Sequence, residues 1–191
     1  PWSSARRARF ERFYAGWLEA LRALDFDGLD HEGQVDYVLL RSQIEYEQEM
    51  LRQEADAARE MATLVPFGER VGAFQEAQRD REDVDARATA AALDDLADEV
   101  EALTLRLREG SGPSPIKGVV AARAAGYVGQ LRRALADWNE YHQGYDPLFT
   151  WWVPEPYERL DAALEAHGRA ITDVYVGPDG VARRFTGEMF P

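Results

Sequence analysis

Apolar residues recur at helical spacing through almost all of the chain before residue 175. Steps of three and four residues place the apolar side chains of each segment on one stripe of an α-helix. Such stripes are buried by packing helices against one another. The sequence therefore predicts an all-α fold, a bundle of several long antiparallel helices.

Capping residues and helix breakers divide this pattern into separate helices. Ser3 or Ser4 can cap the first helix, which carries a wide apolar face and which Asp25–Gly28 closes. Asp30 is the next capping candidate, for a helix expected to run to about Met61. Later helices are expected around Val71 and Phe74, after Asp85, from Ser114-Pro115, at Asp146-Pro147 and from Pro156.

Turn-forming residues suggest how these helices are grouped. Gly110-Ser111-Gly112-Pro113 is the clearest linker, and it separates an N-terminal helical part, 1–109, from a second helical part, 110–175. Both parts are expected in one domain. In the last stretch, 176–191, a Gly-Pro-Asp-Gly turn lies between short β-prone runs, which predicts either a small β-hairpin or an irregular tail.

The composition excludes several classes of function. A net charge of −13 disfavours non-specific binding to nucleic acid and docking on an anionic membrane surface. No apolar run approaches the about 18 residues needed to span a bilayer. Without cysteine there are no disulfides, thiolate nucleophiles or cysteine-based metal sites. The chain starts with Pro rather than Met and shows no signal peptide, so we expect it to be processed or excised from a longer protein.

The three histidines do not have the spacing of a metal site. A zinc peptidase motif needs two histidines one helical turn apart with a glutamate between them, and His31-Glu32 begins such a motif but lacks the second histidine. His142 follows a glutamate at a spacing that does not suit a di-iron bundle either. We therefore expect no metal ligands or cofactor in this chain. His167 lies on an apolar stripe, which favours a hydrogen-bonded histidine in the core.

Two carboxylates are the nearest approach to a catalytic pair. Glu45 and Glu49 lie one helical turn apart. They could perform acid–base chemistry if a cavity raised the pKa of one of them. A solvated helix face explains them equally well, and no catalytic residue is assigned.

The aromatic segment 144–157 holds the best candidates for a binding site. Tyr145, Asp146, Trp151 and Trp152 combine aromatic walls with one carboxylate, which suits a peptide or an amine-bearing ligand. The alternative is that the two tryptophans fill the junction between two helical layers.

Several segments resemble the N-terminal part of a bacterial family known as domain of unknown function 885. They are Glu32–Arg41 with Glu45-Tyr46-Glu47, Pro66-Phe67, and Tyr145–Val153 with Pro156-Tyr157. Members are mainly helical, much longer than this chain, and often exported or lipid-anchored. They carry a HExxH-type motif far downstream and are likened to zinc metallopeptidases. This sequence stops before any such motif, so the resemblance implies zinc and hydrolysis only for a parent protein.

Three functional hypotheses follow. The first is an N-terminal region of a metallopeptidase-like protein that forms a scaffold or one wall of its substrate cleft, with the remainder of the parent chain and a peptide substrate as partners. The second is a non-catalytic helical module that binds a protein partner through the aromatic surface. The third is a self-contained enzyme that uses Glu45 or Asp146. The oligomeric state stays open.

Overall fold

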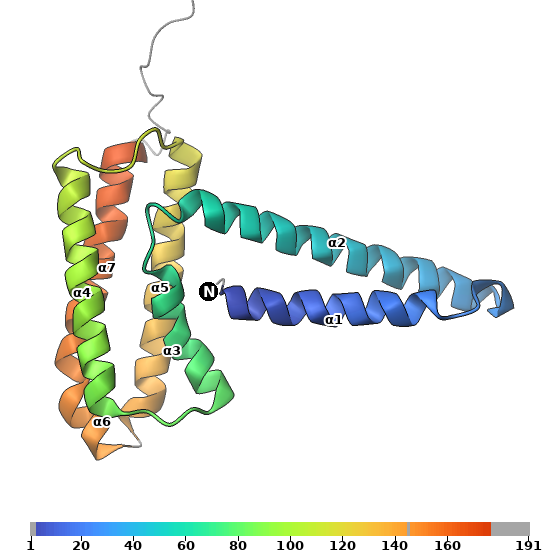
Figure 1. Ribbon diagram of the computed structural model, residues 1–191, viewed down its shortest axis with the longest axis horizontal. Helices are drawn as coiled ribbons and strands as arrows, with labels where there is room; N and C mark the ends of the chain where they lie inside the picture. The colour runs from blue at the N-terminus through green and yellow to red at the C-terminus, as the bar shows by residue number, and fades with distance from the viewer. Residues whose placement is uncertain (1–2, 145, 177–191) are drawn as a thin grey trace, which may run out of the picture. The chain divides into compact units, whose positions relative to one another are not determined.

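The computed structural model describes residues 3–144 and 146–176, which form helices and their connections (Figure 1). No strand occurs among these residues. The predicted all-α fold is confirmed. In the same part of the chain, no helix is long and apolar enough to cross a membrane.

The chain forms two compact units. The first comprises helix α1 (Ser4–Arg22), a short 3₁₀ turn, and the part of helix α2 (His31–Met61) that ends at Arg59. The second begins at Glu60. The linker expected at 110–113 therefore lies within the second unit, and the division between the units falls in the last turn of α2.

The first unit is a helical hairpin that begins as the sequence predicts. The Ser3 hydroxyl accepts a hydrogen bond from the Arg6 backbone N–H at 3.0 Å. Likewise the Asp30 carboxylate accepts from the Gly33 N–H at 2.8 Å. Each cap satisfies a backbone N–H that has no partner within its helix. These two predicted helix starts are confirmed.

The core of the hairpin is small. Its cluster of buried side chains consists of Leu18, Leu21 and Ile44, and the rings of Tyr14 and Tyr37 pack against it at half-buried positions. The wide apolar face expected on the first helix is therefore split into two stripes, because helix α2 covers only one side of α1. On the other side, Phe13 and Trp17 stay 55% and 49% exposed.

The second unit is a bundle of helices. It contains α3 (Gly68–Asp80), α4 (Ala86–Arg108), α5 (Gly118–Gln143), α6 (Pro147–Trp152), α7 (Pro154–Ile171) and a π-helical turn (Thr172–Val176). The long helices α4, α5 and α7 run side by side, with α5 antiparallel to the other two (Figure 1). Helix α3 packs on α5, and the short α6 closes the end of the bundle where α5 stops and α7 starts.

The bundle buries the stripes that the sequence marks out. Side chains that are no more than 1% exposed come from all three long helices and include Leu93, Leu96, Val100, Leu131, Leu135, Leu160, Leu164 and Ile171. The expected caps at Asp85 and Asp146 are both present. Their carboxylates accept hydrogen bonds from the first backbone N–H groups of α4 and α6.

Helix α5 begins three residues later than predicted. The sequence suggested a start at Ser114-Pro115, but the first helical residue is Gly118, with the exposed Lys117 before it in an extended conformation. A proline tolerates the first helical position without requiring a helix there. Here the buried stripe begins at Gly118, while the Pro113 carbonyl accepts a hydrogen bond from the Tyr175 hydroxyl at 2.7 Å. Tertiary packing thus sets the start of the helix.

The strand expected to open the C-terminal hairpin is also not formed. Residues 174–176 belong to the π-helical turn that continues α7, where Tyr175 and Val176 are buried. The continued burial favours helix over the local β propensity. The rest of the expected hairpin or tail, 177–191, lies outside the described residues.

Candidate functional site

The short helix α6 contains Trp151 and Trp152, and Asp146 is its N-cap. The Asp146 carboxylate caps it by accepting from the Leu148 N–H at 2.8 Å. The Thr150 hydroxyl donates to the Gln143 carbonyl at 3.0 Å, which ties α6 to the end of α5. On the inner side, Phe149 is 1% exposed and Val153 is fully buried. These contacts fix the orientation of a helix that is too short to be stable alone.

The outer side of α6 is apolar and exposed. Trp151 is 79% exposed and Leu148 is 64% exposed, and their spacing of three residues places them on one face. Trp152 is less exposed, because the guanidinium of Arg87 from the start of α4 lies over its ring, 4.8 Å from the centroid. This cation–π contact holds the second tryptophan against the bundle.

An aromatic cluster packs between α6 and the end of α5. The Phe149 ring lies 5.3 Å from both Trp138 and His142, measured between centroids. Burial lowers the pKa of His142, so its imidazole is neutral at pH 7. Among the described residues, His142 Nε2 and the Oδ1 atom of the buried Asn139 have no hydrogen-bond partner. The cluster is therefore held together mainly by packing of the rings, and two of its buried polar atoms make no hydrogen bond.

The structure brings together only part of the predicted binding set. Trp151 and Trp152 are adjacent on α6, and Trp151 points outward while Trp152 leans on Arg87. The carboxylate of Asp146 is engaged in capping its own helix. Tyr145 lies outside the described residues. A ligand role for these four residues stays a prediction, and no signal in the sequence pointed to Arg87.

His167 is a core histidine, as the sequence predicts. It is 1% exposed, and its ring joins two elements of the bundle. Nε2 lies 2.8 Å from the Leu64 carbonyl oxygen and Nδ1 lies 3.0 Å from the Thr104 hydroxyl. Because only a protonated nitrogen can donate to the carbonyl, Nε2 carries the hydrogen of the neutral ring. Burial lowers the pKa of His167, and the bond to Leu64 partly opposes this shift.

Glu45 and Glu49 are paired with arginines on an exposed helix face. Arg41 donates to Glu45 at 2.8 Å, and Arg52 donates to Glu49 at 2.9 Å. The hydrogen bond from Arg52 lowers the pKa of Glu49, with a further contribution from Gln53. A general acid would need a raised pKa instead. This arrangement favours the solvated-face interpretation.

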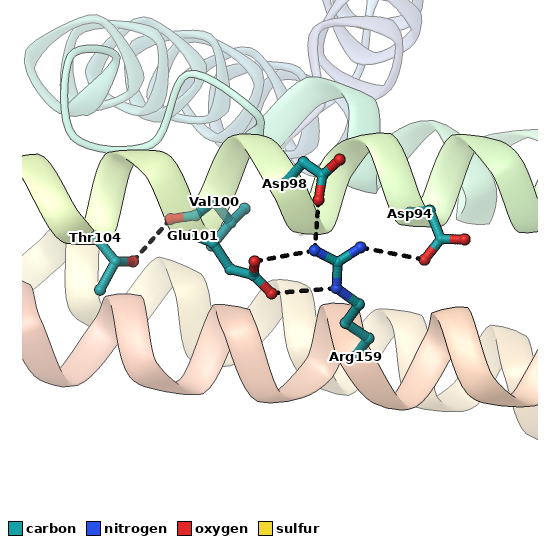
Figure 2. Close-up of polar contacts among 6 residues, drawn as sticks. All are labelled: Asp94, Asp98, Val100, Glu101, Thr104 and Arg159. Carbon is teal, nitrogen blue, oxygen red and sulfur yellow. Dashed lines mark hydrogen bonds and ion pairs between the residues drawn. The ribbon is translucent and has the colours of Figure 1, made fainter.

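A cluster of charged side chains joins α4 to α7. Arg159 donates to both oxygens of Glu101, at 3.2 and 3.0 Å, and also contacts Asp98 and Asp94 (Figure 2). Hydrogen bonds to Glu101 and Asp98 raise the pKa of Arg159. All four groups are exposed or only partly buried, so this is a surface network that aligns two helices.

A groove of about 480 Å³ runs along the seam between α5 and α7. Its floor is made of small and aliphatic residues, including Ala125, Gly129 and Gly168. Arg132 on its rim makes a two-point ion pair with Asp161, at 2.8 and 2.7 Å. Gly126 and Gly129 both lie within helix α5. No protein atom would lie within 3.4 Å of a Cβ at either.

No protein-family profile, curated protein or solved structure matches this chain. The resemblance to domain of unknown function 885 therefore stays a prediction from the sequence. Within 3–144 and 146–176, no three side chains of His, Asp or Glu lie close enough to hold a metal ion.

Proposed function

We propose that this chain is a helical scaffold that binds a polypeptide segment through the exposed apolar side chains of α6. The observation that carries the proposal is the contrast within one helix. Trp151 is 79% exposed, whereas Phe149 two residues earlier is 1% exposed and anchors the helix. A large exposed ring on a helix that is fixed in position is better suited to binding a partner than to packing within the bundle.

Helix α6 is preorganised for binding. Tryptophan is enriched among the residues that contribute most to protein interfaces. An interface gains most when its side chains are already held in position, because less conformational freedom is lost on binding. Capping by Asp146, the bond from Thr150 and the burial of Phe149 all restrict α6 before any partner arrives. Leu148 and Trp151 would then bury apolar surface at little further cost.

Two settings fit this role. In the first, the polypeptide is the remainder of a longer metallopeptidase-like chain or its peptide substrate, and α6 forms part of a cleft wall. This setting rests on the resemblance to domain of unknown function 885. In the second, the chain is a non-catalytic module and the polypeptide belongs to another protein. A HExxH motif in the reading frame downstream of Pro191 would favour the first setting, and a stop codon there would favour the second.

Selection from a random peptide library tests the binding itself. We expect the full chain to enrich peptides whose binding weakens by about tenfold or more in Trp151→Ala, as for an interface residue contributing at least about 1.4 kcal/mol. Trp17→Ala, which removes an exposed tryptophan of the hairpin, is the matched control and should bind normally. Failure to enrich any peptide, or equal binding by Trp151→Ala, contradicts the proposal.

Fluorescence gives an independent check of the free surface. Replacing Trp151 with Phe should remove the red-shifted, readily quenched part of the emission, whereas Trp138→Phe should remove a blue-shifted part that acrylamide scarcely quenches. Trp138 is 2% exposed. If the emission lost with Trp151 is blue-shifted and protected, another part of the chain covers α6 and the proposed site is not open.

A further inference from the structure

The exposed apolar face of α6 continues into an acidic surface on α7. Val153, which lies between the two helices, has helical dihedral angles of φ −90° and ψ −33°. Buried side chains run through both helices at steps of four and three residues: Phe149, Val153, Pro156 and Leu160. The exposed face is continuous for the same reason, and the same steps place Glu155 and Glu158 in line with Trp151.

This surface carries more negative charge than its arginine balances. Glu155 and Glu158 are exposed, and neither forms an ion pair with another residue of 3–144 or 146–176. Next to them, Arg159 is shared by three carboxylates of α4 (Figure 2). The side chains of Asp94, Asp98 and Glu101 remain 49%, 68% and 50% exposed. This part of the surface therefore has five carboxylates and one arginine, a net charge of −4.

Two contacts between α4 and the α6–α7 segment give this surface a direction. Arg87 of α4 lies over the ring of Trp152. Seven residues farther along each segment, Asp94 contacts Arg159. Seven residues of helix span about 10 Å, and Glu101 lies about 10 Å farther again. The exposed apolar side chains of α6 are thus at one end of the surface, and the carboxylates extend from there along α4 and α7 (Figure 1).

We propose that the ligand of this surface is a polypeptide segment with an apolar anchor followed by lysine or arginine residues. This inference rests on the function proposed for α6, because α6 must bind the anchor. The anchor contacts Leu148 and Trp151, and the cationic side chains lie against the carboxylates of α4 and α7. In an extended peptide of about 3.3 Å per residue, the first cation lies about three residues from the anchor and the last about six.

Charge complementarity selects a cationic segment over an acidic one. A cation on this surface is attracted by several carboxylates at once, and it reduces the repulsion among the carboxylates that share Arg159. An acidic segment adds to that repulsion. Arg87 is the cation at the apolar end, and its charge disfavours a second cation at the anchor position. Because each pair of exposed charges contributes little, the gain is mainly in specificity and in the rate of association.

Two peptide libraries test the preference for cations. They share the same randomised apolar positions and differ only at positions three to six residues beyond these, where one library has lysine and the other glutamate. At low salt, we expect the best lysine ligands to bind the full chain with a Kd about tenfold or more below that of the best glutamate ligands. This ratio should shrink at about 1 M salt, where charges are screened. Equal affinities, or a preference for glutamate, overturn the proposal.

Removal of two carboxylates tests the surface itself. Glu155→Gln/Glu158→Gln should raise the Kd of the lysine ligands by about threefold or more and should not weaken the glutamate ligands. Glu109→Gln/Asp173→Asn is the matched control, because it removes the same charge from exposed positions at the opposite end of the bundle. The control should leave Kd unchanged. Equal weakening by the two variants, or no weakening by the first, contradicts the proposed position of the cations.

Trp151→Ala separates the preference for cations from the role of α6. If ligands of both libraries bind equally well and Trp151→Ala weakens both, the preference is overturned and the role of α6 stands. If neither library yields a ligand, or if the lysine ligands bind Trp151→Ala as well as the unsubstituted chain, the role of α6 is itself contradicted.

Discussion

The hairpin and the bundle are built from similar amphipathic helices, but they differ in how many neighbours each helix has. Of the buried apolar side chains in the described residues, only four lie before Glu60, namely Leu18, Leu21, Ile44 and Leu51, and the other thirty lie in the bundle unit. In the bundle, each long helix packs its apolar stripes against the neighbouring helices and so buries them. In the hairpin each helix has one neighbour, so one stripe stays exposed. Burial in this chain therefore depends on the number of neighbouring helices more than on the sequence of any one helix.

The largest expected effect comes from a cavity in the bundle core. Leu164→Ala should lower the free energy of unfolding of the bundle unit by about 2–5 kcal/mol, since Leu164 is fully buried. Leu18→Ala should cost less and should affect only the hairpin, because Leu18 keeps 8% exposure beside a smaller core. Hydrogen exchange resolved by segment measures both. Equal losses of unfolding free energy in the two units would contradict the conclusion that the bundle buries its core more completely than the hairpin does.

The next effect is a pH dependence confined to the bundle. Burial lowers the pKa of His167 and of His142, so the unfolded chain binds protons that the folded bundle does not. Stability should therefore be greatest above the unfolded pKa of about 6.5 and should fall as the pH drops from there through the lowered pKa values.

The matched variants are His167→Gln and His142→Gln. Each should flatten part of this pH dependence in urea unfolding monitored by circular dichroism. An unfolding free energy that is flat between pH 7 and pH 5 in the unsubstituted chain would contradict the buried neutral state of both imidazoles.

Removing a helix cap from each unit should lower the free energy of unfolding by similar, intermediate amounts, in α4 for one variant and in α2 for the other. Asp85→Ala removes a carboxylate that accepts from the N–H groups of Arg87 and Ala88 at 3.0 Å, and Asp30→Ala removes one that accepts from Gly33. Each should cost about 1 kcal/mol. Amide exchange should quicken in α4 for the first variant and in α2 for the second. Spread of either effect into the other unit would mean that the units unfold together.

The smallest effect is expected at the surface charge network. Arg159→Gln removes the arginine that joins Asp94, Asp98 and Glu101 of α4 to α7 (Figure 2). Exposed ion pairs contribute little and are screened by salt. The melting temperature of the bundle should fall slightly at low ionic strength, and the difference should vanish at about 1 M salt. A difference that persists at high salt would show that Arg159 contributes by packing.

Local signals in the sequence predicted most of the fold. Helix caps at Ser3, Asp30, Asp85 and Asp146 could be found because a short polar side chain before an apolar stripe has a local physical role. The start of α5 could not, because the contact between Tyr175 and Pro113 joins residues far apart in the chain. Which stripe of α1 is buried could not be predicted either. That outcome depends on the number of helices available to cover it.

The candidate site was predictable in part. Composition alone pointed to the aromatic segment, and the short helix it forms is anchored by Phe149 with Trp151 exposed. Sequence could not separate Trp151 from its neighbour Trp152, because the difference comes from Arg87, which approaches from another helix. It also could not show that the Asp146 carboxylate is occupied by capping. Both facts depend on tertiary geometry.

The exposed position of Lys117 at the start of α5 has a practical consequence. It is the only lysine of the chain, which otherwise carries 21 arginines. Among the side chains, amine-reactive dyes can therefore attach only at Lys117. Blocking the terminal amine first leaves a single attachment point within the bundle unit. A fluorophore or spin label can thus be installed there without altering any residue.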